Sequence, residues 1–179
     1  MSNKKIVNLK DLKTIRKKNK KDIVLVHGVF DIVHKGHLEY FKEAKKFGNI
    51  LVASVTDDKY VKKGFNRPYF KSLDRIKFLS ELDIIDKVVL SKNKSSIEII
   101  NSLKPNFYVK GPDYLDKKND KAGNLEAEKK AVKMNGGKII FTSGILMSST
   151  KIINDNFNEF NVIPKFLKQN KLSFFNKSK

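Results

Sequence analysis

Short apolar runs alternate with helical patterns along most of this chain, and that alternation limits the folds open to it more than any other feature. Five runs have the composition of buried strands, and they are Ile23–His27, Ile50–Thr56, Lys87–Leu90, Phe107–Lys110 and Lys138–Thr142. Four segments between them carry apolar residues at helical spacing, and they are Gly36–Phe47, Ser72–Leu82, Ser96–Leu103 and Leu125–Asn135. Repeated strand–helix units predict an α/β fold, a Rossmann-like, doubly wound parallel sheet of about five strands with helices on both faces.

Shifts in composition divide the chain into three parts. Residues 1–21 are basic, and we expect them to form a loosely held N-terminal segment ahead of a main domain over residues 22–155. Residues 156–179 are rich in Asn and Lys but contain two apolar runs, Val162–Leu167 and Leu172–Phe175. We expect this C-terminal extension to be a helix that caps the domain, a contact in a homodimer, or the start of a further domain.

The sequence lacks the marks of a membrane or secreted protein. No apolar run approaches the roughly 18 residues that a membrane span needs. The first residues, MSNKKIVNLK, lack the apolar stretch of a signal peptide. Cysteine is absent, so the chain has neither a disulfide framework nor a thiolate metal site. We therefore expect a cytoplasmic protein that makes no membrane contact.

The net charge of +19 raises the question of nucleic-acid binding. Only Arg16, Arg67 and Arg75 among the 38 basic residues are arginine, and the lysines are scattered along the whole chain. This distribution is typical of a broad drift in composition rather than of a basic stripe, so it disfavours nucleic acid as the main ligand. A positive field would still attract nucleoside triphosphates and phosphorylated substrates.

All the histidines of the chain fall in one short segment, LVHGVFDIVHKGH, as His27, His34 and His37. The segment begins where the first apolar run ends, and it finishes where the first helical pattern begins. A strand-to-helix turn of this kind directs free backbone N–H groups at whatever binds there, and anions bind there best. Imidazoles can also donate hydrogen bonds to phosphate oxygens. The segment therefore predicts a phosphate site.

The sequence GVFDIVHKGH resembles the signature of the cytidylyltransferase-like nucleotidyltransferases, in which an HxGH element binds the triphosphate. Three further segments resemble the rest of that pattern in the same order, and they are Asn66-Arg-Pro…Arg75, Lys110-Gly-Pro-Asp-Tyr114 and Met147-Ser-Ser-Thr-Lys-Ile-Ile153. The resemblance implies that residues 22–155 form a nucleotidyltransferase domain. In such a domain a phosphorylated substrate attacks the α-phosphorus of a nucleoside triphosphate bound with Mg²⁺, and pyrophosphate leaves.

The rings of His34 and His37 would face the same phosphates, because residues three apart at the start of a helix share one face. Donors placed there would stabilise the charge on the α- and β-phosphates in the transition state. Arg75 lies in the first turn of a predicted helix, where a basic residue opposes the helix dipole, and this misfit favours a ligand role. The resemblance adds a lysine after the second strand, although Lys62 and Lys63 also fit a solvated pair. The residues assigned to catalysis are His34, His37, Lys63 and Arg75.

Most other motif residues are assigned to the nucleotide. Gly28 and Gly36 would let the backbone approach a phosphate closely. Asp31 is an anion, so we expect it to orient the loop or a histidine, or to help hold Mg²⁺. The resemblance implies that the glycine-then-acid element contacts the base or ribose, and that hydroxyls at the start of the last helix hold the β- and γ-phosphates. The nucleotide-binding set is Gly28, Val29, Phe30, Asp31, Gly36, Lys110, Gly111, Asp113, Tyr114, Ser148, Ser149 and Thr150.

Lys62 and Arg67 are assigned to the phosphorylated substrate. The identity of that substrate is open between two subgroups of the family. The Asn66-Arg67-Pro68 segment, the Lys-Gly-x-Asp-Tyr element and the Asn135-Gly-Gly137 turn resemble heptose 1-phosphate adenylyltransferases, which use ATP and a sugar phosphate. The length and the compact motif set resemble glycerol-3-phosphate cytidylyltransferases, which use CTP and a polyol phosphate. The heptose subgroup is the preferred interpretation. The resemblance also makes a homodimer an expectation.

A protein of a different class stays open at this point. By residue type, His27, His34, His37 and Asp31 are a plausible ligand set for a metal-dependent hydrolase. Such a site would leave the three other phosphate-type segments unexplained. We therefore predict nucleotidyl transfer and assign no residue of the chain as a ligand of a resident metal ion.

Overall fold

One parallel sheet and the helices packed against it make up the described part of the chain. The computed structural model describes residues 4–62, 67–115 and 123–143. Its strands are β1 (Ile6–Val7), β2 (Ile23–Gly28), β3 (Ile50–Thr56), β4 (Lys87–Ser91), β5 (Phe107–Lys110) and β6 (Lys138–Phe141). Its α-helices are α1 (Leu9–Lys18), α2 (Lys35–Lys45), α3 (Ser72–Ser80), α4 (Ile97–Leu103) and α5 (Leu125–Met134). The short 3₁₀ helices are η1 (Asp58–Tyr60) and η2 (Pro112–Leu115).

The α/β class and the parallel, Rossmann-like sheet predicted from the sequence are confirmed. Each predicted strand and helix forms, with ends that shift by no more than two residues. The sheet has six strands rather than about five, because the short β1 adds to its edge beside β4.

The order of the strands places the loop after β2 beside the loop after β5. The order is β1-β4-β3-β2-β5-β6, and each neighbouring pair is parallel. The chain builds outward from β2 through β3 to β4, then returns to β5 on the other side of β2 and continues to β6. The winding therefore reverses between β2 and β5, and the carboxyl ends of such strands form the usual ligand site of this architecture.

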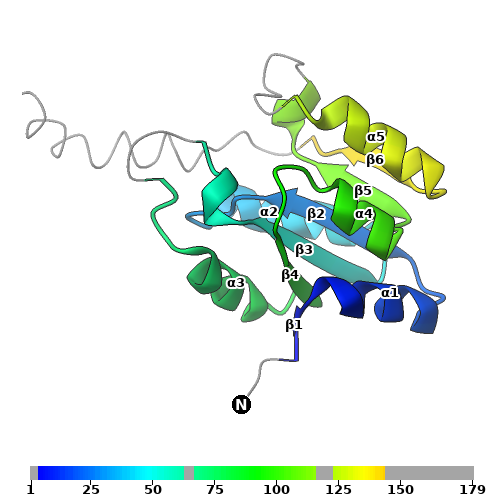
Figure 1. Cartoon of the computed structure of the whole chain (residues 1–179), viewed down its shortest axis with the longest axis horizontal. Coiled ribbons are helices and arrows are strands. Elements are labelled where there is room, and N and C mark those ends of the chain that lie inside the picture. The colour runs from blue at the N-terminus through cyan, green and yellow to red at the C-terminus, as the bar shows by residue number, and fades with distance from the viewer. Residues whose placement is uncertain (1–3, 63–66, 116–122, 144–179) are drawn as a thin grey trace, which may run out of the picture. The chain divides into compact units, whose positions relative to one another are not determined.

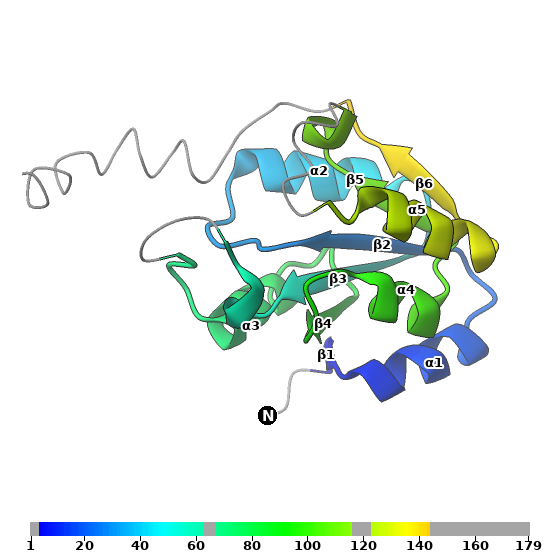
Figure 2. The same cartoon turned by 45° about the horizontal axis from the view of Figure 1, so that its top comes forward.

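Helices cover both faces of the sheet, as Figures 1 and 2 show. In β2, Ile23 and Leu25 belong to the core shared with α1, α4 and α5, whereas Val24 and Val26 belong to the core shared with α2 and α3. A strand sends successive side chains to opposite faces, so a continuous apolar run is what a strand buried on both faces requires. The two cores hold β2 rigidly in the middle of the sheet.

The expectation of a loosely held N-terminal segment over residues 1–21 is wrong for the part that the structure describes. Ile6 pairs with Val88 in the sheet, and Asn8 caps α1 through a capping box with Asp11. Leu12 is fully buried against α4 and its neighbours. Four of the eight lysines of this segment are exposed on the amphipathic helix α1, and they obscure the apolar spacing that anchors it.

The described residues belong to one compact unit within Met1–Leu146. The predicted C-terminal extension over residues 156–179 lies outside the described residues, and so do the domain boundary near residue 155 and the alternatives for the extension. None of the helices in the described ranges is long and apolar enough to cross a bilayer.

Candidate active site

The turn between β2 and α2 is shaped by Phe30, which folds back beneath Gly28. Phe30 has a φ of 49°, in the left-handed region that non-glycine residues rarely adopt, and its side chain is buried. A Cβ atom on Gly28 would lie 3.0 Å from Phe30 Cζ, so the aromatic ring occupies the space that any larger residue would need. The buried ring of Phe30 therefore supports the turn from beneath. A backbone strained at this point is typical of functional sites.

His34 and His37 lie side by side at the start of α2. Their ring centroids are 4.0 Å apart, with an interplanar angle of 32°. His34 is the N-cap residue, and its carbonyl oxygen accepts from the His37 amide at 2.9 Å. The His37 ring also meets the edge of Phe30 at 5.5 Å between centroids, so the pair rests on an aromatic base. The structure brings the two predicted catalytic rings together at the end of β2.

Asp31 organises the segment before α3. Its two carboxylate oxygens accept from the backbone amides of Tyr69 at 2.9 Å and Phe70 at 3.0 Å. Arg67 Nε lies 3.0 Å from Asp31 Oδ2, and both side chains are buried. Of the roles predicted for Asp31, this geometry supports the orienting one, because both oxygens already have partners. Arg67 Nη2 is buried with no hydrogen-bond partner among the described residues, so a donor of this predicted substrate ligand remains unused.

Arg75 is a structural clamp. Its Nε donates to the Phe70 carbonyl at 3.0 Å, its Nη1 to the Val29 carbonyl, and its Nη2 to the Thr56 carbonyl at 2.9 Å and to Asp58 Oδ1 at 2.7 Å. The residue is only 2% exposed, so its fork has no face left for a phosphate. The predicted catalytic role of Arg75 therefore gives way to a positioning role, in which it ties the turn after β2 to the end of β3.

Asp58 explains why a basic residue is tolerated in the first turn of α3. Its Oδ2 accepts from the Ser72 amide at 3.1 Å, while Oδ1 accepts from Arg75. Burial by itself would raise the pKa of Asp58, but these hydrogen bonds and the charge of Arg75 hold the pKa below its ordinary value. The carboxylate supplies the negative charge that the helix N-terminus favours, so the dipole misfit needs no ligand to explain it.

The second half of the site follows β5. Lys110 is buried and pairs with Glu128 of α5 at 2.9 Å, and its ammonium lies 4.3 Å from the centroid of the Tyr114 ring. Gly111 and Tyr114 belong to the turn that contains η2, in which the Tyr114 amide donates to the Gly111 carbonyl at 3.2 Å. The Lys110 side chain therefore points inward. Its predicted contact with the nucleotide is corrected to a contact beneath the loop that would receive it.

His27 lies between these two halves and is neutral near pH 7. Burial first, and the positive charge of Lys110 second, lower the pKa of His27 to about 4. Its Nδ1 lies 3.0 Å from Ser54 Oγ, and its Nε2 lies 3.4 Å from Thr56 Oγ1. The His27 ring therefore contacts side chains of the neighbouring strand β3 within the sheet.

The lowered pKa of His27 predicts a loss of stability in mild acid. The unfolded chain takes up a proton near pH 6.5 and the folded one only near pH 4, so folding stability falls as the pH falls through this window. From pH 7 to pH 5 the wild-type protein should lose about 2 kcal/mol more of its free energy of unfolding than His27→Gln. Urea denaturation at the two pH values measures the difference. Equal losses in the two proteins would contradict the assignment.

The other predicted site residues lie only partly within the described ranges. Gly36 lies in the first turn of α2, and Lys62 is exposed just after η1. The predictions for Lys63, Ser148, Ser149 and Thr150, and for the side chain of Asp113, lie outside the described part of the chain.

Sequence reasoning missed two acidic residues that organise the site, Asp58 and Glu128. For Glu128 a signal was present, because its spacing from Leu125, Ala131 and Val132 puts it on the buried face of α5. Asp58 had no such signal, since its partner Arg75 lies 17 residues further along the chain.

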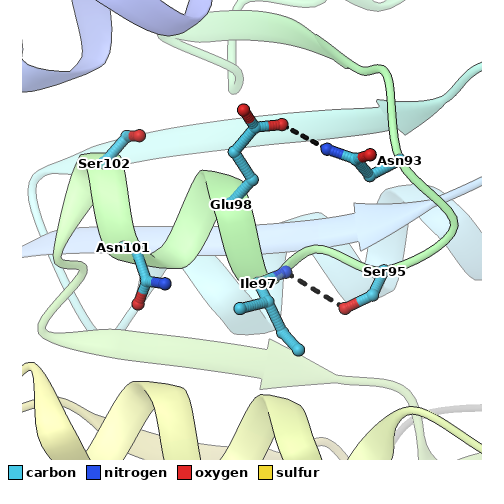
Figure 3. A pocket seen from close by; sticks show the side chains of 6 residues that line it. All are labelled: Asn93, Ser95, Ile97, Glu98, Asn101 and Ser102. Carbon is cyan, nitrogen blue, oxygen red and sulfur yellow. Dashed lines mark hydrogen bonds between the residues drawn. The ribbon is translucent and has the colours of Figure 1, made fainter.

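A surface pocket of about 440 Å³ lies away from this site. It is lined by Asn93, Ser95, Ile97, Glu98, Asn101 and Ser102, at the start of α4. Figure 3 shows that the Asn93 amide donates to Glu98 and that the Ile97 amide donates to Ser95 Oγ, so these groups satisfy one another. This pocket contains none of the predicted site residues.

A family model and several known proteins are similar to this chain. The family model described as cytidylyltransferase-like matches residues 25–155. The bifunctional protein HldE from Campylobacter jejuni (strain RM1221) is 41% identical over 116 residues, which is 64% of this chain and 25% of that protein. HldE from Helicobacter pylori (strain G27) is 36% identical over 153 residues, which is 84% of this chain and 32% of that protein. The chain therefore spans a quarter to a third of the length of these curated relatives.

A solved structure resembles most of the chain. The crystal structure of the lipopolysaccharide core biosynthesis protein from Thermoplasma volcanium GSS1 matches with a TM-score of 0.59 and 27% identity. The match covers 70% of this chain and 99% of that one.

Proposed function

Because the chain belongs to the cytidylyltransferase-like family, we propose that it transfers a nucleotidyl group to a phosphorylated sugar, in the manner of heptose 1-phosphate adenylyltransferase. The observation that carries the proposal is the pair of adjacent imidazoles of His34 and His37, which follow the strained turn after β2. That turn lies beside the switch point of the sheet, where ligands of this architecture bind.

The chemistry needs hydrogen-bond donors rather than a strong base. A phosphate monoester is already ionised near neutral pH, since its second pKa is about 6. One of its oxygens forms a bond to the α-phosphorus, the bond between the α-phosphorus and its bridging oxygen breaks, and pyrophosphate leaves. Catalysis then depends on alignment and on stabilising the charge that spreads over phosphate oxygens. His34 and His37 supply donors for that charge, and Arg67 Nη2, which has no hydrogen-bond partner among the described residues, is assigned to the phosphate of the substrate.

Mg²⁺ belongs to the proposal as the partner of the triphosphate. Among the described residues no three His, Cys, Asp or Glu side chains are grouped so that they could hold a metal ion. The Asp31 oxygens are engaged with the amides of Tyr69 and Phe70. The described residues therefore fit a metal ion that arrives bound to phosphate oxygens, which neutralises charge there. The same geometry argues against the metal-dependent hydrolase, because His27 and Asp31 are directed to other partners.

The choice of sugar phosphate is supported by the relatives. HldE proteins match most of this chain, and the Thermoplasma protein is named for lipopolysaccharide core biosynthesis. Cytoplasm stays our proposal for the compartment. A homodimer is supported by four exposed large apolar side chains on α3 and the segment before it, which are Tyr69, Phe70, Leu73 and Phe78.

A pyrophosphate-release assay tests the proposed function. ATP, CTP, GTP and UTP with Mg²⁺ are crossed with heptose, glycerol, ribitol, ethanolamine and choline phosphates. We expect release with ATP and heptose 1-phosphate. Release only with CTP and glycerol 3-phosphate would establish the alternative subgroup of the family. No release from folded protein with any pair would contradict nucleotidyl transfer to this class of substrate.

A further inference from the structure

A buried ion pair lies beneath the loop that follows β5. Lys110 Nζ is 2.9 Å from Glu128 Oε2, and the two side chains are only 4% and 3% exposed. Burying two charges is costly, and apolar residues of similar volume are often as stable at such positions. A charged pair in this place therefore calls for an explanation beyond packing.

The Glu128 carboxylate is satisfied by groups from two other elements, the N-cap residue of α4 and strand β5. Its Oε1 accepts from the Ser96 amide at 3.1 Å and the Ser96 hydroxyl at 2.8 Å, and its Oε2 accepts from the Tyr108 hydroxyl at 3.0 Å. Burial by itself would raise the pKa of Glu128, but Lys110 and these hydrogen bonds hold the pKa below its ordinary value. The carboxylate is thus charged near pH 7 and keeps the Lys110 ammonium in one position.

The Lys110 ammonium, held in this position, contacts an aromatic ring of the loop. It lies 4.3 Å from the ring centroid of Tyr114 and 5.0 Å from that of Tyr108. A desolvated cation–π contact is attractive and directional. Tyr114 closes the turn at Gly111 through its backbone amide. The base of the loop is therefore built in layers, with the Glu128 carboxylate innermost, the Lys110 ammonium next and the Tyr114 ring outermost.

The end of β5 is also joined to the turn that carries the histidines. The Tyr40 hydroxyl, on α2, donates to the Val109 carbonyl oxygen at 2.6 Å. The position of residues 111–114 relative to His37 therefore depends on how firmly β5 and its loop are held. Glu128, on the opposite face of the sheet, is the group that holds them from below.

We propose that Glu128 is a positioning residue for nucleotide binding, which acts through the Lys110 ammonium and the Tyr114 ring to fix residues 111–114. The inference rests on the proposed function, in that it takes a nucleoside triphosphate as the ligand of this loop. It explains why a buried charge is kept at a place where the sequence predicted a direct contact between Lys110 and the ligand.

Glu128→Gln tests the inference. The amide keeps the shape but removes the charge that fixes Lys110, so the loop is no longer held in one conformation. We expect the Kd for ATP or CTP, measured by isothermal titration calorimetry, to rise about tenfold, as the loss of one charge-assisted contact implies. Hydrogen–deuterium exchange of the peptide that contains residues 111–114 should become faster. Glu126→Gln, on the same helix but 73% exposed, is the matched control and should change neither quantity.

A double variant separates positioning from stability. Lys110→Met with Glu128→Gln removes both charges while the amide oxygen of the glutamine can still accept from Ser96, and it should restore most of the Tm lost in Glu128→Gln, because no unpaired charge is then buried. The Kd should stay raised, because the ammonium that supports Tyr114 is gone. If the double variant recovers both the Tm and the Kd, the pair is only structural and the inference is overturned.

The calorimetric readout needs no phosphorylated substrate, so two failures can be told apart. Nucleotide binding that Glu128→Gln leaves unchanged overturns the inference alone. Binding that Glu128→Gln weakens, in a protein that releases no pyrophosphate with any acceptor, overturns the proposed function alone. Wild-type protein that binds neither ATP nor CTP overturns both.

Discussion

Replacing either His34 or His37 with alanine should lower kcat by about a hundredfold to a thousandfold, which is the usual cost of removing one preorganised donor from a transition state. The two rings lie side by side with 4.0 Å between centroids, so they can contact the same phosphate group. Donors fixed in this way stabilise developing charge without reorganising. Single-turnover measurements of pyrophosphate release at saturating substrates give the change in the chemical step.

The fold should survive these substitutions. His34 caps α2 with its backbone but makes no side-chain cap hydrogen bond, so His34→Ala removes none. The double variant should be little worse than either single one, because residues that act as a unit are strongly non-additive. Lys42→Ala, at an exposed position of the same helix, is the control for a change in helix charge and should keep full activity. Turnover retained in both single histidine variants would remove them from the catalytic role.

Arg75→Lys should lower the free energy of unfolding by about 3 kcal/mol, at about 1 kcal/mol for each hydrogen bond lost. The guanidinium donates to three backbone carbonyls and to Asp58, and the single ammonium of lysine cannot reproduce that fork. Because Val29 loses its tether, kcat/KM should also fall, by about a hundredfold, as small misplacements of a site commonly produce. Urea denaturation and steady-state kinetics measure the two effects.

A second arginine provides the control for Arg75. Arg16 donates one hydrogen bond, to Asn106 Oδ1 at 2.8 Å, so Arg16→Lys should cost about 1 kcal/mol and leave kcat/KM unchanged. One result would contradict the assignment of Arg75 as a structural clamp. If Arg75→Lys keeps wild-type stability while kcat falls, then the arginine has the direct ligand role that its place in the first turn of a helix led us to predict.

Local periodicity was enough to predict most of the fold. Apolar runs of four to seven residues and apolar residues at helical spacing depend on neighbours within a few positions, so β2 to β6 and α2 to α5 could be predicted from the sequence. The segment at β1 and α1 was missed because its lysines dominate the composition, while its apolar stripe is narrow. The pairing of His34 with His37 was also local, since three positions at a helix start place two rings together.

The sequence by itself thus determined the fold class, the turn after β2 and the pair of histidines at the start of α2. Only the tertiary structure decided what the buried charges do. Asp31 meets an amide 39 residues away, Arg75 a carbonyl 46 residues away, and Lys110 a carboxylate on α5. A charged side chain is stable in the interior only beside its partner, and these partners lie on other elements of the fold. The motif therefore predicted ligands at Arg75 and Lys110, where long-range packing made supports for the site.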